Sequence, residues 1–304
     1  MPSFLFFLLM RRPLRSSWLA RLLLLLLSLP AVAAAAGPYD TGLLWRLEKA
    51  GSPPAFLFGT VHVDDPRVTQ LPEAVARRFD AAGEFTMEVI FDPAMLKVLA
   101  GRMLYTDGRD LPQVAGAELY GKTLAAAGDL GLPPEVLRLF RPWAVAMLLI
   151  MPRPQHGDVL DVMLMKRAQA QGKPVHQLET VDEQIALFEN LPERDQLMML
   201  RHTVDNLETA RRGVREVVEA WLARDLAALA RISDRADISD PEMRRFNERF
   251  RAELIDRRNL RMVERMQPRL AAGGFIAVGA LHLHGPQGVL ARLATLGYAV
   301  TREY

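Results

Sequence analysis

The stretch that decides the fold is Phe56-Leu57-Phe58-Gly59-Thr60-Val61-His62, an apolar run that ends in glycine with a histidine three positions later. The same pattern returns near the other end of the chain as Phe275-Ile276-Ala277-Val278-Gly279-Ala280-Leu281-His282. Short apolar runs of this kind predict buried strands. Ligands of open α/β sheets bind beyond the carboxyl ends of the strands, where both histidines would lie. The pair therefore predicts a two-histidine site closed by the fold.

The composition is that of an ordinary globular protein, with 304 residues of which 50% are hydrophobic. The formal net charge is +2, but four arginines precede residue 37, so the rest of the chain is slightly acidic. Nucleic-acid binders show a concentrated basic face, and this sequence predicts none. The absence of cysteine excludes disulfides, thiolate metal sites, a cysteine nucleophile and a lipid-modified N-terminal cysteine.

Residues 1–36 have the pattern of a secretory signal peptide. Basic residues precede the leucine run Leu22–Leu27, and the small-residue segment Ala31–Ala36 follows it. A retained membrane anchor is the alternative, but the unbroken apolar run is shorter than the ~20 residues that span a bilayer. We expect a periplasmic or secreted protein that is not a lipoprotein and meets the membrane only through this segment. Residues 37–304 would form a single domain.

The rest of the chain alternates predicted strands with predicted helices. A turn at Gly51–Pro54 would join the first two strands into a hairpin. A helix over Asp158–Gln171, closed by Gly172, precedes a short strand, which is typical of an α/β sheet. The strands expected are Leu43–Leu47, Phe56–His62, Glu84–Ile90, Lys173–Glu179, Phe275–His282 and Tyr298–Val300.

Helical patterns fill most of the remaining sequence. Segments rich in helix signals cover residues 93–143, and Pro142–Met151 reads as a buried helix. Residues 181–266 are helical and heavily charged, with Asp240-Pro241 as a strong helix start. The predicted fold class is therefore α/β, with a central mixed sheet flanked by helices and a large helical insertion, at about 181–266, before the last strands.

His62, His282 and Glu88 are the first candidate site residues. Glu88 lies in an otherwise apolar strand, where a carboxylate is costly to bury unless it is paired or binds a cation. Two histidines and a carboxylate form a ligand set suited to a divalent metal. The alternatives are two unrelated histidines at strand ends and a glutamate that faces water.

Further candidates are Glu179, Arg258 and Asn259. Glu179 ends a predicted strand, and Asn259 is a poor interior helix residue that is expected to be kept for a contact. His284 could reach the same site as His282. The sequence has no H-E-x-x-H, no G-x-S-x-G, no Walker loop and no G-x-G-x-x-G.

Six blocks in this order resemble the TraB/GumN family, which includes the TIKI metalloproteases: LLWRLEKAGSPPAFLFGTVHVDDPRVTQLPEAV, FTMEVIFD, FRPWAVAMLL, GDVLDVMLMKRAQAQGKPVHQLET, IDRRNLRMVERM and FIAVGALHLHGPQGVLARLATLGYAV. The resemblance covers residues 41–304 and implies a fold related to the erythromycin-esterase and ChaN-like group. The family's two G-x-x-H motifs and glutamate match His62, His282 and Glu88. Its G-L-E-T block matches Glu179, with Gln177 where the family has glycine. Its R-N pair matches Arg258 and Asn259.

The resemblance implies a metal-dependent hydrolase, a peptidase acting on peptides or proteins, which the predicted signal peptide would export. The cofactor would be a divalent ion, manganese or cobalt, with zinc a further option. Glu179 or Glu88 would be the general base, and Arg258 and Asn259 would stabilise oxyanion charge or orient a carboxylate. One alternative is a non-catalytic envelope protein that binds haem or another ligand through His62, His282 or methionines. Another is a scaffold with a vestigial site. The sequence does not set the oligomeric state.

Overall fold

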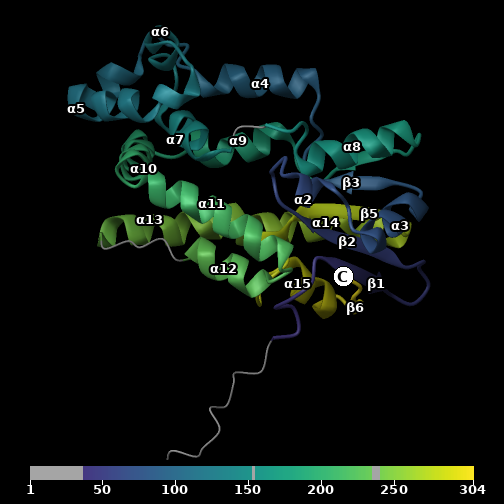
Figure 1. Cartoon of the computed structure of the whole chain (residues 1–304). Helices are drawn as coiled ribbons and strands as arrows, with labels where there is room; N and C mark the ends of the chain where they lie inside the picture. Colours follow the sequence, from purple (N-terminus) through teal and green to yellow (C-terminus); the bar gives the residue numbers. More distant parts are fainter. Residues whose placement is uncertain (1–36, 153–154, 235–239) are drawn as a thin grey trace, which may run out of the picture. The chain divides into compact units, whose positions relative to one another are not determined.

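A mixed sheet lies at the centre of the fold. The computed structural model describes residues 37–152, 155–234 and 240–304. In this part of the chain the strands form one six-stranded sheet in the order β4-β3-β5-β2-β1-β6 (Figure 1). The strands are β1 Leu44–Glu48, β2 Ala55–Thr60, β3 Phe85–Met87, β4 Val175–Gln177, β5 Phe275–Gly279 and β6 Ala299–Arg302.

The pairing of the strands sets one functional edge of the sheet. β1 and β2 form the predicted antiparallel hairpin, and β6 pairs antiparallel with β1. β2, β5, β3 and β4 are parallel, so their carboxyl ends meet at one edge. The four parallel strands are shorter than predicted. β2 ends at Thr60 and β5 at Gly279, so both histidines follow their strands.

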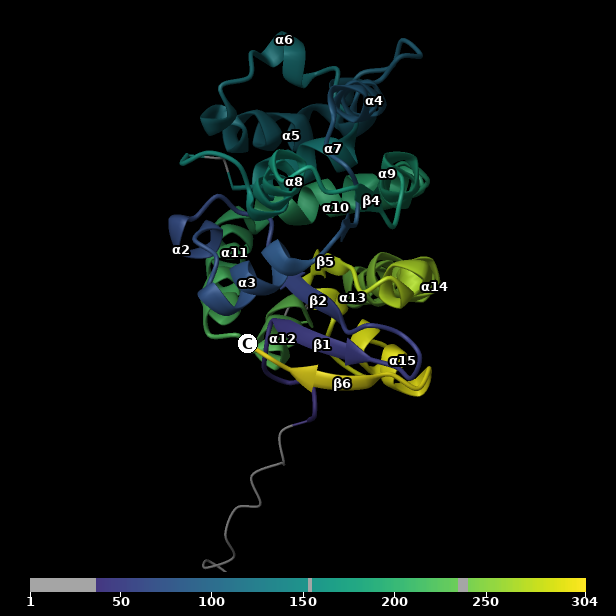
Figure 2. The same cartoon turned by 90° about the vertical axis from the view of Figure 1, so that its right-hand side faces the viewer.

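Helices cover both faces of the sheet. On one face lie α3 (Glu73–Ala81), α8 (Leu160–Ala170) and α11 (Leu207–Leu222). The ring of Phe79 in α3 lies 5.2 Å from those of Phe85 and Phe275, and Trp221 in α11 packs edge-on against Phe58. The other face carries α14 (Arg258–Ala271) and α15 (Val289–Thr295), and Figure 2 shows α3 and α14 on opposite sides of the strands.

A second group of helices builds its own core. It contains α4 (Pro93–Met103), α5 (Leu111–Ala126), α6 (Pro134–Leu137), α7 (Pro142–Ile150), α9 (Val181–Glu189) and α10 (Glu193–Asp205). Figure 1 shows α4, α5 and α6 gathered away from the strands. α7 confirms the predicted buried helix, and its Val145 and Leu149 pack with Leu119 and Leu200.

The helical insertion before the last strands is confirmed, because helices follow one another from α9 to α14. The remaining elements are α2 (Pro66–Thr69), η1 (Gly128–Leu130), α12 (Leu226–Asp234), α13 (Pro241–Arg251), the π-helical segment η2 (Ala252–Arg257) and the 3₁₀ turn η3 (Ala280–His282). Asp240 caps α13 as predicted, since its carboxylate accepts from the Glu242 N–H. The helical run that begins at Pro241 continues through η2 into α14, and a π-helical segment of this kind is frequent at functional sites.

The predicted signal peptide, residues 1–36, lies outside the described residues. Within the ranges that are described, no helix combines the length and the apolar character needed to cross a bilayer.

Candidate active site

The predicted site residues gather at the carboxyl ends of the parallel strands. His62 follows β2, Glu88 follows β3, Glu179 follows β4, and His282 ends the turn η3 after β5. Arg258 and Asn259 open α14, and both are buried. Because the four strands are parallel, the topology places the side chains that follow them at the same edge.

The glycines of the two G-x-x-H motifs allow close packing between the motifs. A Cβ on Gly59 would lie 2.7 Å from Leu283 Cδ1 and 3.1 Å from Ala280 Cα. A Cβ on Gly279 would lie 3.3 Å from Glu88 Oε1. The Gly279 N–H donates to that same oxygen at 2.7 Å. The glycines therefore serve contacts between strand ends, and the second one brings a backbone donor to Glu88.

Asn259 fixes the orientation and tautomer of His282. The Asn259 Nδ2 donates to the Gln287 carbonyl at 2.9 Å, which turns its Oδ1 toward His282 Nδ1 at 2.7 Å. His282 Nδ1 is therefore the donor, and Nε2 carries the lone pair. Burial lowers the pKa of His282 to about 4, against the opposing effect of Glu88, so the ring is neutral at pH 7.

Glu88 faces that lone pair. Its Oε1 lies 3.8 Å from His282 Nε2. Burial acts to raise the pKa of Glu88, but His282, Arg258, His62 and the Gly279 N–H outweigh it and lower the pKa to about 2. An anionic oxygen and an imidazole lone pair thus face each other across a short gap, an arrangement that a cation between them would stabilise.

Arg258 joins Glu88 to Glu179. Its Nη2 pairs with Glu88 Oε2, and both Nε and Nη2 donate to Glu179 Oε2, at 2.9 and 2.8 Å. Arg261 Nη2 donates to Glu179 Oε1 at 2.9 Å. The Glu179 side chain is completely buried, and both of its oxygens are bound by arginines. Burial acts to lower the pKa of Arg258, but the two carboxylates raise it, so the guanidinium stays charged.

His62 is held by a residue that the sequence analysis missed. Asp161, in the first turn of α8, accepts from Thr60 Oγ1 at 2.7 Å and lies 2.7 Å from His62 Nδ1. The negative charge of Asp161 raises the pKa of His62 to about 9. The His62 side chain is 54% exposed, whereas that of Asp161 is 5% exposed. The missed signal was an acid on the apolar face of α8, in line with Leu164, Met165 and Ala168.

The other histidines lie elsewhere. His284 was expected to reach the site of His282. Its Nε2 instead pairs with Asp40 Oδ1 at 2.9 Å. His176 accepts from Arg269 at 3.0 Å, beside Glu84. Among the described residues, no three histidine, aspartate or glutamate side chains are already grouped so as to hold a metal ion.

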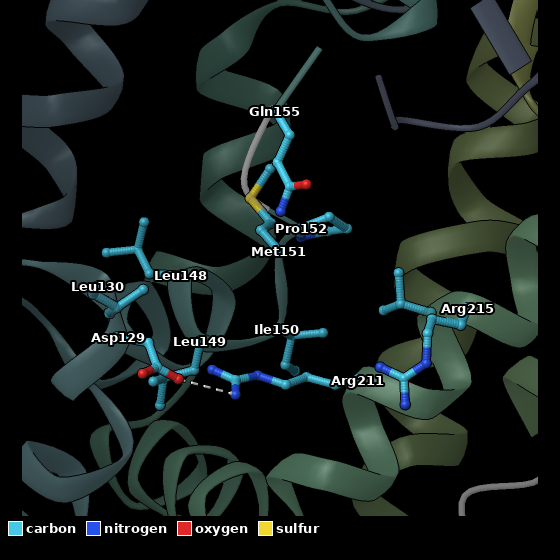
Figure 3. Close-up of a pocket in the computed structure, with 11 residues that line it drawn as sticks. Asp129, Leu130, Leu148, Leu149, Ile150, Met151, Pro152, Gln155, Arg211 and Arg215 are labelled. Carbon is cyan, nitrogen blue, oxygen red and sulfur yellow. Dashed lines mark hydrogen bonds and ion pairs between the residues drawn. The ribbon is translucent and has the colours of Figure 1, made fainter. Parts of the chain in front are cut away.

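A cavity of about 320 Å³ between the end of α7 and α11 is separate from these residues (Figure 3). None of the predicted site residues lines it. Figure 3 shows Arg211 directed toward Asp129, to which it is paired at 3.4 Å.

Named metalloproteases are among the relatives of this chain. Metalloprotease TIKI2 of Danio rerio is 26% identical over 310 residues, which cover 84% of this chain and 60% of that protein. The metalloprotease TIKI homolog of Amphimedon queenslandica is 26% identical over 344 residues, covering 93% of this chain and 66% of that protein. Uncharacterized protein YbaP of Escherichia coli (strain K12) is 27% identical over 162 residues, 52% of this chain and 58% of that protein.

The chain thus spans about 60% of the length of the curated relatives it matches first. No solved structure gives a significant match. The model of the TraB/PrgY/gumN family matches residues 43–302, which include every predicted site residue, so the chain belongs to the TraB/PrgY/gumN family.

Proposed function

We propose that the chain is an exported metal-dependent hydrolase that cleaves peptide bonds, with His62, Glu88 and His282 as the metal ligands. The observation that carries the proposal is the pair formed by Glu88 Oε1 and His282 Nε2, two electron-pair donors 3.8 Å apart. Two of the relatives are named metalloproteases, and their names support the same class of activity.

The donor set fits a divalent ion. Metal-binding histidines typically donate their second ring N–H to a carboxylate or carbonyl oxygen, which fixes the tautomer. His282 does so to Asn259 Oδ1 and His62 to Asp161 Oδ2, so each Nε2 is the nitrogen available for an ion. His62 is protonated when free of metal, because its pKa is about 9, so an ion that binds there displaces this proton.

The residues around the ligands have separable tasks. Arg258 orients the Glu88 carboxylate and neutralises part of its charge, and Glu179 anchors Arg258 from the buried side. Asn259 orients His282. Of the two carboxylates predicted as general base, Glu179 has both oxygens bound to arginines. Glu88 serves in this proposal as a metal ligand, and its pKa of about 2 makes it a weak base, so we assign the general-base role to neither. A divalent ion at this site would lower the pKa of a bound water and polarise the scissile carbonyl.

Metal analysis and hydrolysis assays on the full-length chain test this proposal. We expect binding of Mn²⁺, Co²⁺ or Zn²⁺ by calorimetry and hydrolysis of labelled casein in their presence. His282→Ala and Glu88→Gln should abolish both, and His284→Ala is the matched control, since His284 pairs with Asp40.

Two results would contradict the proposal. One is equal metal binding and hydrolysis in His282→Ala and His284→Ala. The other is a haem Soret band that requires His282, without any hydrolysis, which would support the haem-binding alternative.

A further inference from the structure

A cavity of about 660 Å³ beside the candidate active site is lined by residues of α12, α13, η2 and the turn η3. Its volume is within the range of about 300–1,000 Å³ that is usual for ligand pockets. Its apolar lining residues are Phe250, Leu254, Ile255 and Leu281.

Two walls of this cavity adjoin the proposed catalytic residues. Leu281 directly precedes His282 in η3. On the other wall, the Leu254 carbonyl accepts from Arg258 Nη1 at 3.3 Å. The segment η2 thus contributes lining residues to the cavity, and the chain continues from it directly into Arg258 and Asn259. A group held in the cavity would therefore contact Leu281, the chain neighbour of His282, and Leu254, the hydrogen-bond partner of Arg258.

The lining favours an uncharged, apolar group. Phe250, Leu254, Ile255 and Leu281 are half-buried, so their apolar surface is still partly open to solvent. The charges on the lining balance, with two acids and two arginines, and Arg251 pairs with Asp234 at 2.8 Å. A balanced rim gives no preference for a charged side chain, whereas burial of an apolar one against these residues is favourable.

We propose that this cavity is a specificity pocket that binds an apolar side chain of the peptide substrate close to the bond that is cleaved. Ser233 and Asn247, which also line it, supply polar groups for the substrate backbone. This proposal rests on the proposed peptidase function and adds a substrate class to it: peptides with leucine, phenylalanine or a similar residue at one fixed distance from the scissile bond.

Hydrolysis supplies the first test. The cleavage sites of the full-length protein with Mn²⁺ or Co²⁺ in oxidised insulin B chain are mapped by mass spectrometry. We expect an apolar residue at a constant offset from each cut. Two fluorogenic peptides that differ only by leucine or aspartate at that offset should then differ roughly tenfold or more in kcat/KM.

Pocket-filling variants connect that preference to the cavity. Ile255→Trp places a larger side chain in the pocket and should reduce the leucine-to-aspartate ratio toward one. Asn247→Trp fills it from α13 and covers the case in which Ile255→Trp fails to fold. Leu260→Trp is the matched control, because Leu260 is 54% exposed and does not line the cavity. The proposal is overturned if Ile255→Trp and Asn247→Trp leave the leucine-to-aspartate ratio unchanged, as Leu260→Trp should.

A binding test on metal-free protein separates this proposal from the proposed function. In saturation-transfer NMR, N-acetyl-leucinamide should show methyl signals that weaken in Ile255→Trp and Asn247→Trp, whereas N-acetyl-aspartamide should show none. If these signals appear but no peptide is hydrolysed with any metal, the peptidase function fails and the pocket stands. If peptides are hydrolysed without any apolar preference, the pocket fails and the function stands. Absence of both binding and preference overturns the pocket.

Discussion

Replacement of Arg258 by methionine would leave two buried carboxylates without the guanidinium that they share. The side chains of Arg258, Glu88 and Glu179 are 8%, 11% and 0% exposed. Removal of one partner from a buried ion pair costs about 3–5 kcal/mol, because the other charge remains buried and uncompensated. Arg261 still pairs with Glu179, and the Gly279 N–H still binds Glu88, so we expect the lower end, about 3 kcal/mol. The free energy of unfolding of an ordinary domain is about 5–15 kcal/mol, so this loss would be a large fraction of it.

Urea unfolding followed by circular dichroism measures this cost. The matched control is Arg257→Met, one position earlier, where the arginine is 70% exposed and pairs with Glu253 at 2.9 Å. An exposed pair of this spacing contributes about 0.5 kcal/mol or less. Addition of Glu179→Gln to Arg258→Met should cost less than the two single changes added together, by about 1 kcal/mol or more. If Arg258→Met and Arg257→Met destabilise the protein equally, the buried charge cluster does not have the energetics argued above.

Three further predictions concern neighbouring parts of the fold. Gly59→Ala should destabilise the protein by about 1–3 kcal/mol in urea unfolding, because its Cβ meets Leu283 and Ala280, whereas Gly121→Ala on the open surface of α5 should be neutral or stabilising; equal effects would contradict the close packing. Glu183, whose pKa is lowered to about 2 by its hydrogen bonds with Arg265, should stabilise the fold above its ordinary pKa of 4.5 and lose this contribution as the pH falls toward 2. The stability deficit of Glu183→Gln, about 1–2 kcal/mol at pH 7 after allowance for solvent screening, should therefore shrink below pH 4.5, and a constant deficit would refute this. Asp161→Asn should move the pKa of His62 from about 9 toward its ordinary 6.5, as measured by NMR in metal-free protein. An unchanged pKa would show that Asp161 does not stabilise the protonated imidazole.

The sheet could be predicted from the sequence because its strands carry their own signals. Apolar runs bounded by glycine and proline mark β1, β2 and β5, and the turn at Gly51–Pro54 marks the hairpin. The strand ends were harder to predict. Of the expected strand over Glu84–Ile90, the regular strand β3 covers Phe85 to Met87, and the Glu84 and Glu88 carbonyls on either side still accept from backbone N–H groups. His282 lies on a 3₁₀ turn. Pairing with neighbours decides where a strand ends, and local sequence does not contain that information.

The candidate site could be predicted where its residues follow strands, and less well where they come from helices. Glycine spacing pointed to His62 and His282, and an acid in an apolar strand pointed to Glu88. Asp161 was not found, because a single aspartate in an amphipathic helix is usually a surface residue. The position of Arg258 and Asn259 depends on η2, whose π-helical turns have no recognisable sequence pattern. The partner of each polar group is fixed by tertiary contacts that are remote in sequence.

The central position of β5 has a consequence for how the chain folds. β5 pairs with both β2 and β3, yet it is separated from them by most of the chain. Sheet formation must therefore wait for the last thirty or so residues, and such a high contact order predicts slow folding. A fragment that stops before Phe275 would leave β2 and β3 with unpaired inner edges, which are templates for aggregation. Truncation from the carboxyl end should therefore give insoluble protein long before it reaches any of the helices around α5.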